Sequence, residues 1–284
     1  MKENLPSAPT ISDWLQGATR QLVFANIPSA RLDAELLLSH TLRKPRTWLH
    51  GHNDEVLNDR VLEIARARLD LRLDRVPVAY IIGHKEFYGQ PFKVTTATLI
   101  PRPESEVLIE LLADALPKNE SLIAEKPLKL VDVGTGSGCL GITAKLQHPE
   151  LEVTLLDTSR HALNVAEENA QQLHAAVDIV QSDLLTSYPF IADVVIANLP
   201  YVDPSWERSP ETEHEPAGAL FASQGGLALI FELLVQTKEK LAIGGKLILE
   251  ADPEQHAAIK KEAAAYGLVL VRQKEYGLLF DKLA

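Results

Sequence analysis

The sequence predicts an α/β protein in which a small helical domain precedes a seven-stranded, mostly parallel sheet. Two observations carry this prediction. The first 75 residues have apolar side chains at helical spacing, and from residue 128 onward short apolar runs alternate with helical segments. Such alternation is typical of parallel sheets with helices on both faces.

The first domain, assigned to residues 1–78, is expected to contain three helices. Ser12 is the candidate N-cap of the first helix, because an apolar-periodic stretch follows it. Pro28-Ser29 breaks the chain and begins the second helix, and the third covers roughly residues 56–75. One face of the second helix is expected to carry Leu32, Leu36 and Leu37.

A β-hairpin is expected over residues 81–98, inside a linker assigned to residues 79–104. Gly83, Gly89 and Pro91 separate its short β-prone pieces. The end of the linker, Leu99–Glu104, is expected to be extended, because a residue that precedes proline avoids the α region.

The second domain, assigned to residues 105–284, is expected to contain the sheet. Its strands are assigned to residues 128–133, 153–157, 177–181, 193–197, 246–250, 268–272 and 278–281. Helices are assigned to residues 139–147, 159–173 and 226–242, and Gly244-Gly245 is interpreted as a C-cap signal for the last one. Ligands bind such sheets outside the carboxyl ends of the strands.

Composition and charge limit the classes of function. The 284 residues are 46% hydrophobic and 24% charged, as in ordinary soluble domains, and one cysteine forms no intramolecular disulfide. No apolar run spans a bilayer and the N-terminal stretch resembles no signal peptide, so we expect a cytoplasmic protein without a membrane partner. Residues 1–90 carry a net charge of +1 and the remainder −12, which argues against direct nucleic-acid binding.

A glycine loop follows the first strand of the predicted sheet: Val131-Asp132-Val133-Gly134-Thr135-Gly136-Ser137-Gly138. Glycines permit a tight turn and close approach to a ligand. Asp157 ends the next strand, where it can accept hydrogen bonds from a ribose diol. Two cofactors fit this pattern. The dinucleotide fingerprint places its third glycine one residue later, where Cys139 stands, so the loop favours S-adenosylmethionine; a plain βα turn without a ligand is the remaining alternative.

The fourth strand runs directly into Asn198-Leu199-Pro200-Tyr201, at the same edge of the sheet. An asparagine side-chain oxygen and the following backbone carbonyl together form two acceptors for a planar –NH2 group. Such acceptors localise the nitrogen lone pair and stabilise the positive charge that develops during methyl transfer. We therefore assign Asn198, Pro200 and Tyr201 as catalytic, with the Tyr201 ring stacking on the flat substrate. The alternative is a turn whose asparagine bonds to nearby backbone.

Several other residues have two interpretations. Cys139 starts a helix, which could lower its pKa, or it is a small residue behind the loop. Glu250 ends a strand at the ligand edge and either orients the pocket or is solvated. The acidic cluster of Glu207, Glu211, Glu213 and Glu215 is most simply a solvated loop, and otherwise a flap. Nine scattered histidines show no metal-binding spacing, so no metal is expected.

Motifs along nearly the whole chain resemble the protein-(glutamine-N5) methyltransferases, the PrmC/HemK family that modifies peptide chain release factors. The likeness rests on segments with the family's spacing. They are residues 32–38 (Leu-Asp-Ala-Glu-Leu-Leu-Leu), 77–83 (Pro-Val-Ala-Tyr-Ile-Ile-Gly), 100–106 (Ile-Pro-Arg-Pro-Glu-Ser-Glu), 198–201 and 215–220. Three features depart from the family pattern: Leu199 replaces a proline, Leu184 replaces a frequent aromatic residue, and residues 276–281 match the family's ending poorly.

The resemblance implies a Rossmann-like, seven-stranded class I S-adenosylmethionine-dependent methyltransferase domain. Its substrate would be the glutamine of the Gly-Gly-Gln loop of class-I release factors, docked by the N-terminal helices of a monomeric enzyme. It adds Asp183, Leu184 and Asn198 to the cofactor site and assigns Asn198 to Tyr201 to the glutamine amide. It also makes Arg102 and Glu104 a lip of the substrate pocket.

Two rival functions follow from the same residues. Adenine-N6 methylation of DNA or RNA uses the same kind of turn for another flat –NH2 group, although a basic groove would then be needed. A non-catalytic module would bind S-adenosylmethionine or a release factor without turnover.

Overall fold

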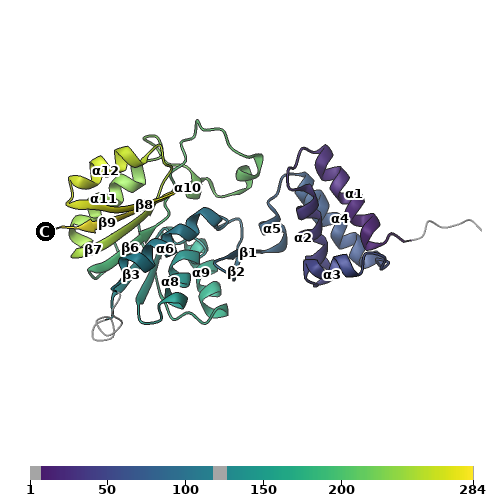
Figure 1. Cartoon of the computed structure of the whole chain (residues 1–284), viewed down its shortest axis with the longest axis horizontal. Helices are drawn as coiled ribbons and strands as arrows, with labels where there is room; N and C mark the ends of the chain where they lie inside the picture. Colours follow the sequence, from purple (N-terminus) through teal and green to yellow (C-terminus); the bar gives the residue numbers. More distant parts are fainter. Residues whose placement is uncertain (1–7, 118–126, 284) are drawn as a thin grey trace, which may run out of the picture. The chain divides into compact units, whose positions relative to one another are not determined.

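The computed structural model describes residues 8–117 and 127–283, and contacts divide the chain into two compact units (Figure 1). The first unit runs to Gly83 and includes Ser209–His214 from far along the chain. The second consists of His84–Arg208 and the chain from Glu215 onward. The helical part therefore extends beyond residue 78, and the expected 79–104 linker is divided between the units; residues 1–7 of the expected first domain lie outside the described residues.

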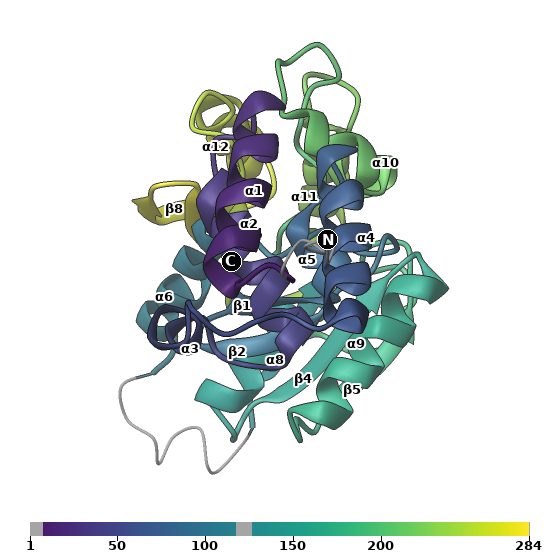
Figure 2. The ribbon, with the colours of Figure 1, turned by 90° about the vertical axis from the view of Figure 1, so that its right-hand side faces the viewer.

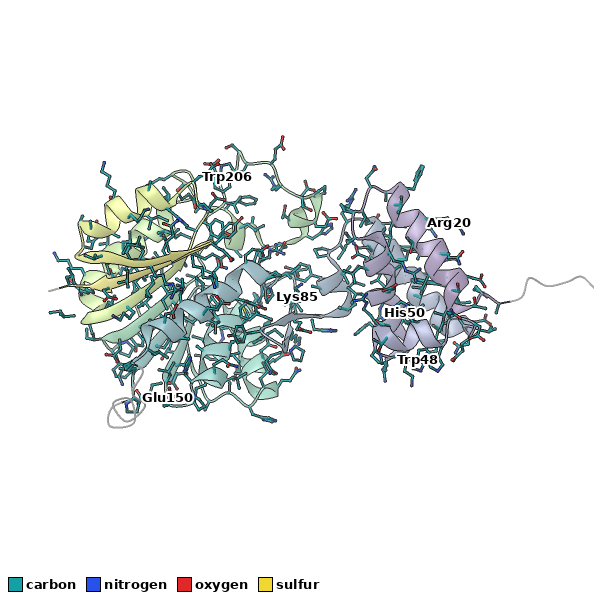
Figure 3. The ribbon with its side chains drawn as sticks, in the orientation of Figure 1. Arg20, Trp48, His50, Lys85, Glu150 and Trp206 are labelled. Atoms are coloured by element: carbon teal, nitrogen blue, oxygen red, sulfur yellow. The ribbon has the colours of Figure 1, made fainter. Side chains whose placement is uncertain are left out.

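Short helices pack around one apolar core in the first unit. They are α1 (Ile11–Phe24), α2 (Ala30–Leu42), α3 (Arg46–Gly51), α4 (Asp59–Leu73) and α5 (Val78–Ile82). Helix α2 contacts α1, α3, α4 and α5, so it connects the other helices of this unit, which are labelled in Figure 2. Leu15, Leu22, Leu38 and Leu69 are among the side chains buried between the helices. Trp48 of α3, which is labelled in Figure 3, stacks on His52, and the ring centroids are 4.0 Å apart.

Two predictions about these helices were wrong. Helix α1 is capped by Thr10 rather than Ser12, because the Thr10 hydroxyl accepts from the Asp13 backbone N–H while the Asp13 carboxylate accepts from the Thr10 backbone N–H. On α2, Leu32 is 42% exposed, whereas the buried face also contains the charged Asp33. Apolar spacing alone did not reveal this face, since Asp33 is buried by pairing with Arg72 of α4.

The second unit contains the predicted seven-stranded sheet. Its strands are β3 (Lys129–Val133), β4 (Glu152–Asp157), β5 (Asp178–Gln181), β6 (Ala192–Ala197), β7 (Leu241–Glu250), β8 (Leu268–Lys274) and β9 (Gly277–Lys282). Their order is β5-β4-β3-β6-β7-β9-β8, and β9 is antiparallel to both neighbours while the other pairs are parallel. The expected hairpin is also present as β1 (His84–Phe87) and β2 (Gln90–Lys93).

Helices cover both faces of the sheet (Figure 1). They are α6 (Glu106–Ala115), α8 (Cys139–Gln147), α9 (Arg160–Gln172), α11 (Ala228–Lys240) and α12 (His256–Ala264), with the short α10 (Ala217–Leu220) before α11. Leu130 and Leu155 face a core shared with α6, α8 and α9, whereas Val131 and Leu156 face the core under α11 and α12. This alternation follows from the two-residue period of a strand.

The structure differs from the sequence prediction in two segments, one that follows a helix and one that precedes a helix. Helix α11 ends at Lys240 and Gly244-Gly245 lies inside β7, so the predicted C-cap was wrong. Gly245 is needed there because an added Cβ would lie 2.8 Å from the backbone carbonyl oxygen of Ala242. The expected extended segment ends at Arg102, since Pro103–Ser105 forms a 3-10 turn, η1, that leads into α6.

The order of the strands determines where a ligand fits. Strand β3 lies between β4 and β6. The chain leaves the carboxyl end of β3 toward β4 and that of β6 in the opposite direction, toward β7, which creates the switch point where ligands bind in open sheets. Val133 pairs with Leu156 and with Ala197, so the segments after these three strands begin side by side. Within the described ranges, no helix is long and apolar enough to cross a membrane.

Candidate active site

A cavity of about 310 Å³ lies at the switch point, entirely within the second unit. It is lined by loops that follow β3, β4, β5 and β6, by the segment before α6, and by residues around α10. The predicted site residues in its lining are Arg102, Gly134, Thr135, Gly136, Ser137, Asp157, Asp183, Leu184, Asn198, Leu199 and Pro200. The lining is largely apolar, with polar groups at the strand ends.

The glycine loop approaches the turn at residues 198–201 very closely. Gly134 has φ +72°, and a Cβ on it would lie 2.9 Å from Cδ2 of Leu199. Gly138 caps α8 with φ +83°, and a Cβ there would lie 2.6 Å from Cδ1 of Ile142, so Gly138 packs behind the loop rather than on the cavity. Both positions therefore require glycine: Gly134 because of its close approach to Leu199, and Gly138 because of its close approach to Ile142.

The buried carboxylate of Asp132 holds the glycine loop in place. Asp132 accepts hydrogen bonds from the Thr135 hydroxyl at 2.6 Å and from the Gly141 backbone N–H at 2.9 Å. Burial raises the pKa of Asp132 to about 6, against the lowering effect of these two donors. Asp132 was not predicted to have a role, although an acidic residue inside an apolar strand is a visible signal in the sequence.

Asp157 joins the end of β4 to the glycine loop. Its Oδ2 accepts from the Gly136 backbone N–H at 2.9 Å and its Oδ1 from the Ser159 backbone N–H at 2.8 Å. Each oxygen keeps a further lone pair, and the side chain lines the cavity. This arrangement holds two acceptors in a fixed orientation, which is what recognition of a diol requires.

The loop after β5 adds one polar and one apolar group. Asp183 is exposed, Leu184 is 6% exposed, and both line the cavity. Leu184 has φ +46°, a left-handed conformation that a leucine adopts at a cost of about 1 kcal/mol or more. The loop therefore holds an aliphatic side chain against the cavity in a strained backbone.

Asn198 is the polar group at the end of β6. Its Nδ2 donates to the Ser105 hydroxyl oxygen at 3.0 Å. None of the residues that the structure describes donates a hydrogen bond to Asn198 Oδ1, and the residue lines the cavity. The side-chain amide is thus oriented with its nitrogen toward Ser105, which leaves its oxygen for another partner.

Tyr201 lies behind the cavity rather than in its lining. Its hydroxyl donates to Glu250 Oε1 at 3.1 Å, and its ring packs against the core under α11 and α12. Burial and Glu250 raise the pKa of Tyr201 far above its usual range, so this phenol is no general base at neutral pH. Its backbone oxygen accepts from Gln255 Nε2 at 2.8 Å, which anchors the turn.

Arg102 and Glu104 behave differently from one another. Arg102 lines the cavity and forms an ion pair with Glu215, whereas Glu104 is exposed and lies outside the lining. Glu215 is 6% exposed and also accepts from the Ile100 backbone N–H at 3.1 Å. The interpretation of Glu215 as part of a solvated loop was therefore wrong; its carboxylate holds the segment before α6 against the segment that enters α10.

Comparisons with known proteins agree with this architecture. Residues 13–83 match the model of the PrmC N-terminal domain, and residues 106–276 match that of the methyltransferase small domain. The release factor glutamine methyltransferase of Koribacter versatilis is 36% identical over 258 residues, covering 86% of this chain and 89% of that relative. The protein of the same name from Escherichia coli K12 is 33% identical, covering 87% and 88%.

The chain belongs to the release factor glutamine methyltransferase family. The suspected resemblance is thereby confirmed, and the protein is a methyltransferase. Among solved structures, a methyltransferase from Pyrococcus furiosus superposes with a TM-score of 0.53 at 16% identity, covering 77% of this chain and 98% of that one. At this identity the likeness concerns the fold alone, and it is the predicted class I methyltransferase fold.

Two residues that contact the turn after β6 were missed or left open from the sequence. Ser105 is 2% exposed and contacts Asn198; Glu250 is 2% exposed and contacts Tyr201. Both residues lie in segments that the sequence had already singled out, but only the fold shows that Ser105 contacts Asn198 and that Glu250 contacts Tyr201. Cys139 lines the cavity, and burial together with Asp132 raises its pKa to about 12, which excludes the alternative that the helix start lowers it.

Proposed function

We propose that the protein transfers a methyl group from S-adenosylmethionine to the side-chain amide nitrogen of the glutamine in the Gly-Gly-Gln motif of class-I peptide chain release factors. Family membership supports the release factor as substrate. The observation that carries the finer proposal is the orientation of Asn198, whose side-chain oxygen is available in the cavity while its nitrogen is held by Ser105. We assign the reaction to a cytoplasmic, monomeric enzyme.

The cavity has suitable groups for S-adenosylmethionine. Asp157 provides fixed carboxylate oxygens for the ribose hydroxyls, and the glycine loop lets the backbone approach the methionine part. Leu184 provides an apolar surface for the adenine, with Asp183 at the rim. The sulfonium of S-adenosylmethionine supplies an activated methyl group, and an acidic domain is compatible with its positive charge.

Asn198 and the Leu199 carbonyl would hold the glutamine –NH2 group by its two hydrogens. This contact localises the nitrogen lone pair, which then forms the N–C bond while the C–S bond breaks and its electron pair stays on sulfur. The nitrogen loses its extra proton to solvent afterwards, so no side chain has to act as a base first. The rate enhancement then comes mainly from placing nitrogen and methyl in line.

The test is incubation of the full chain with labelled S-adenosylmethionine and a class-I release factor. We expect label on the factor and none on its loop variant in which the target glutamine is alanine. Mass spectrometry of the loop peptide would then locate the methyl group on the side-chain nitrogen. Label that persists on the alanine variant would refute the proposal.

The same incubation includes ribosomal RNA, because the turn at residues 198–201 also suits the flat –NH2 group of adenine. The net charge of −12 on residues 91–284 disfavours a nucleic-acid substrate. Label on RNA with none on the release factor would establish that alternative instead. Binding of S-adenosylmethionine with no label on either would indicate a non-catalytic module.

A further inference from the structure

We propose that Ser105 and Glu250 are positioning residues that fix the side-chain amide of Asn198 with its oxygen toward the cavity. This inference rests on the proposed function, in which Asn198 Oδ1 accepts a hydrogen bond from the target –NH2 group. It assigns a role to a serine and a glutamate that lie 145 residues apart in the sequence and that the fold brings into contact with one turn, residues 198–201.

An asparagine amide has two orientations that differ by a half-turn. In one orientation its oxygen faces the substrate and accepts a hydrogen bond; in the other its –NH2 group faces the substrate. Only the first can hold an –NH2 target, because the second would place donors against donors. A transferase of this kind therefore needs a device that selects between the two orientations.

Ser105 is the immediate partner that makes this selection. Its oxygen accepts from Asn198 Nδ2 at 3.0 Å, and its side chain is almost completely buried. The backbone position is fixed as well, since Ser105 ends the 3-10 turn η1 and its N–H donates to the Arg102 carbonyl at 3.1 Å. Arg102 is in turn paired with Glu215, and this ion pair holds the segment that contains Ser105 in place.

A serine hydroxyl is by itself ambiguous, because it can donate or accept. Glu250 removes this ambiguity. An ionised carboxylate is only an acceptor, so neighbouring side chains turn their donors toward it. Tyr201 donates to Glu250 Oε1, while Oε2 is buried and lacks a hydrogen-bond partner among the described residues.

The other groups around Glu250 act in two directions. Burial and the nearby charge of Glu104 raise the pKa of this carboxyl group, whereas the side chains of Ser105, Tyr201 and Asn198 lower it as donors. We assign the Ser105 proton to the carboxylate of Glu250, because its buried Oε2 has no other hydrogen-bond partner among the described residues; the serine oxygen then has lone pairs free to accept from Asn198 Nδ2. The direction of donation thus runs from Asn198 through Ser105 to Glu250, and it leaves Asn198 Oδ1 facing the cavity.

The first arm of the test observes the amide without any substrate. In the ¹⁵N-labelled full chain, the Asn198 side-chain –NH2 signals are assigned by their loss in Asn198→Asp. We expect slow hydrogen exchange and a nuclear Overhauser effect to the Ser105 β protons. Ser105→Ala should accelerate the exchange and Ser105→Thr should restore the slow rate, whereas Ser39→Ala, a buried serine of α2, serves as the matched control. Fast exchange in the unsubstituted protein would overturn the inference.

The second arm measures single-turnover methylation of the release factor. Ser105→Ala should lower the rate constant about fivefold at unchanged S-adenosylmethionine affinity, the equivalent of one ordinary hydrogen bond. Ser105→Thr should recover most of the rate. Glu250→Gln should lower the rate about tenfold, because a carboxamide can donate to Ser105 and reverse the chain of donors. Unchanged rates in both Ser105→Ala and Glu250→Gln would contradict the inference.

The two arms separate this inference from the proposed function. If the unsubstituted protein fails to methylate a release factor, the proposed substrate is wrong, and the exchange measurement still decides how Asn198 is oriented. If it methylates the factor while Asn198 exchanges rapidly, the substrate is right and the positioning role of Ser105 and Glu250 is wrong.

Discussion

Asn198 and Asp157 both end strands at the cavity, but their surroundings give them different tasks. Asp157 has both oxygens engaged by backbone N–H groups of two loops, so it is a rigid acceptor pair suited to binding. Asn198 has its nitrogen engaged and its oxygen available, so it is suited to the reacting nitrogen. At the scale of single residues, binding of the cofactor and chemistry should therefore be separable by mutation.

Asn198→Ala is expected to abolish methylation while leaving S-adenosylmethionine binding largely intact, because its side chain contacts mainly the target amide in our proposal. The rate is measured with a release factor and the affinity by titration calorimetry of the same preparation. Retained turnover would remove Asn198 from the mechanism.

Asp157→Ala is expected to weaken S-adenosylmethionine binding by about 1–3 kcal/mol, the cost of leaving ribose hydroxyls unpaired in a buried site. Calorimetry provides the measurement. Asp178→Ala, which removes an exposed carboxylate from the neighbouring β5, is the matched control and should bind as the unsubstituted chain does. Equal affinity in the two variants would show that Asp157 makes no such contact.

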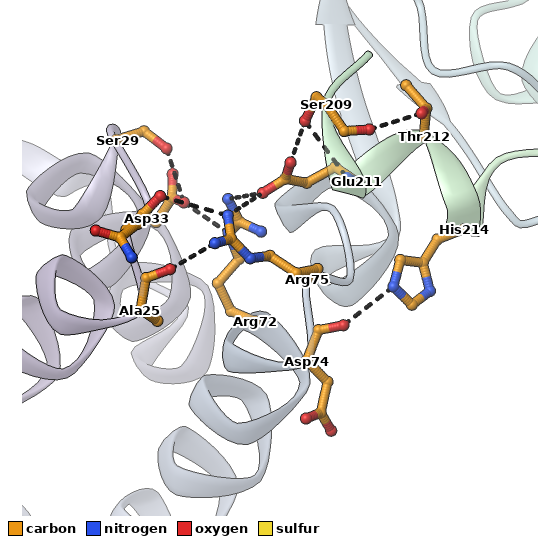
Figure 4. A network of polar contacts seen from close by, with 11 residues as sticks. Ala25, Ser29, Asp33, Arg72, Asp74, Arg75, Ser209, Glu211, Thr212 and His214 are labelled. Atoms are coloured by element: carbon orange, nitrogen blue, oxygen red, sulfur yellow. Dashed lines mark hydrogen bonds and ion pairs between the residues drawn. The ribbon is translucent and has the colours of Figure 1, made fainter. Parts of the chain in front are cut away.

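At the scale of elements, the segment Ser209–His214 shows how an acidic loop acquires a fixed position. It belongs to the helical unit, where Glu211 pairs with Arg72 at 3.0 Å and Arg75 at 3.3 Å (Figure 4). Arg72 is 5% exposed and also pairs with Asp33 at 2.7 Å, so Glu211 completes the neutralisation of a buried arginine. The interpretation of Glu211 as a solvated side chain was therefore wrong.

Glu211→Gln is expected to loosen this segment, because a neutral amide replaces the charge that faces Arg72 and Arg75. Limited trypsin digestion should then cleave faster after Arg208, the exposed basic residue at the start of the segment. Glu207→Gln, a change of an exposed acid on the other side of Arg208, is the control. Equal cleavage rates in the two variants would mean that the ion pairs do not restrain the loop.

The carboxylate of Glu211 is also expected to make the stability of the folded protein depend on pH. Partial burial alone would raise the pKa of Glu211, but hydrogen bonds from Ser209, from its own backbone and from Arg72 outweigh it and lower the pKa to about 2. A lowered acid pKa contributes stability that is present above about pH 4.5 and is lost as pH falls toward 2. In urea unfolding, the free energy of unfolding of the unsubstituted chain should exceed that of Glu211→Gln at pH 6. This difference should become smaller at pH 3. A difference of constant size would contradict this.

These elements also show what the sequence alone can predict. The strands that carry the site were predicted within a residue at their carboxyl ends, because apolar runs buried on both faces leave a clear pattern in β3, β4 and β6. Gly244-Gly245 was misassigned, since a glycine pair has the same appearance in a helix cap and in an irregular strand. Glu215 was misassigned because its partner Arg102 lies 113 positions away, and no local pattern reports such a contact.

At the scale of the whole molecule, charge is distributed unequally along the chain. Residues 1–90 are nearly neutral and the remainder carries a net charge of −12. An enzyme that bound nucleic acid through phosphate contacts would lose about 10³-fold or more in affinity between 50 and 200 mM salt. A protein substrate held by packing and hydrogen bonds is much less sensitive, because exposed charges beyond about 10 Å are already screened at 0.1 M.

We therefore expect KM for the release factor to change less than about tenfold between 50 and 200 mM potassium chloride, with kcat nearly constant. Steady-state methylation at four salt concentrations tests this, and S-adenosylmethionine is kept saturating so that only the protein substrate is titrated. A steep logarithmic loss would reveal several phosphate-like contacts and would favour a nucleic-acid substrate. A shallow dependence is what the uneven charge predicts, since the net charge of −12 on residues 91–284 opposes the approach of a polyanion.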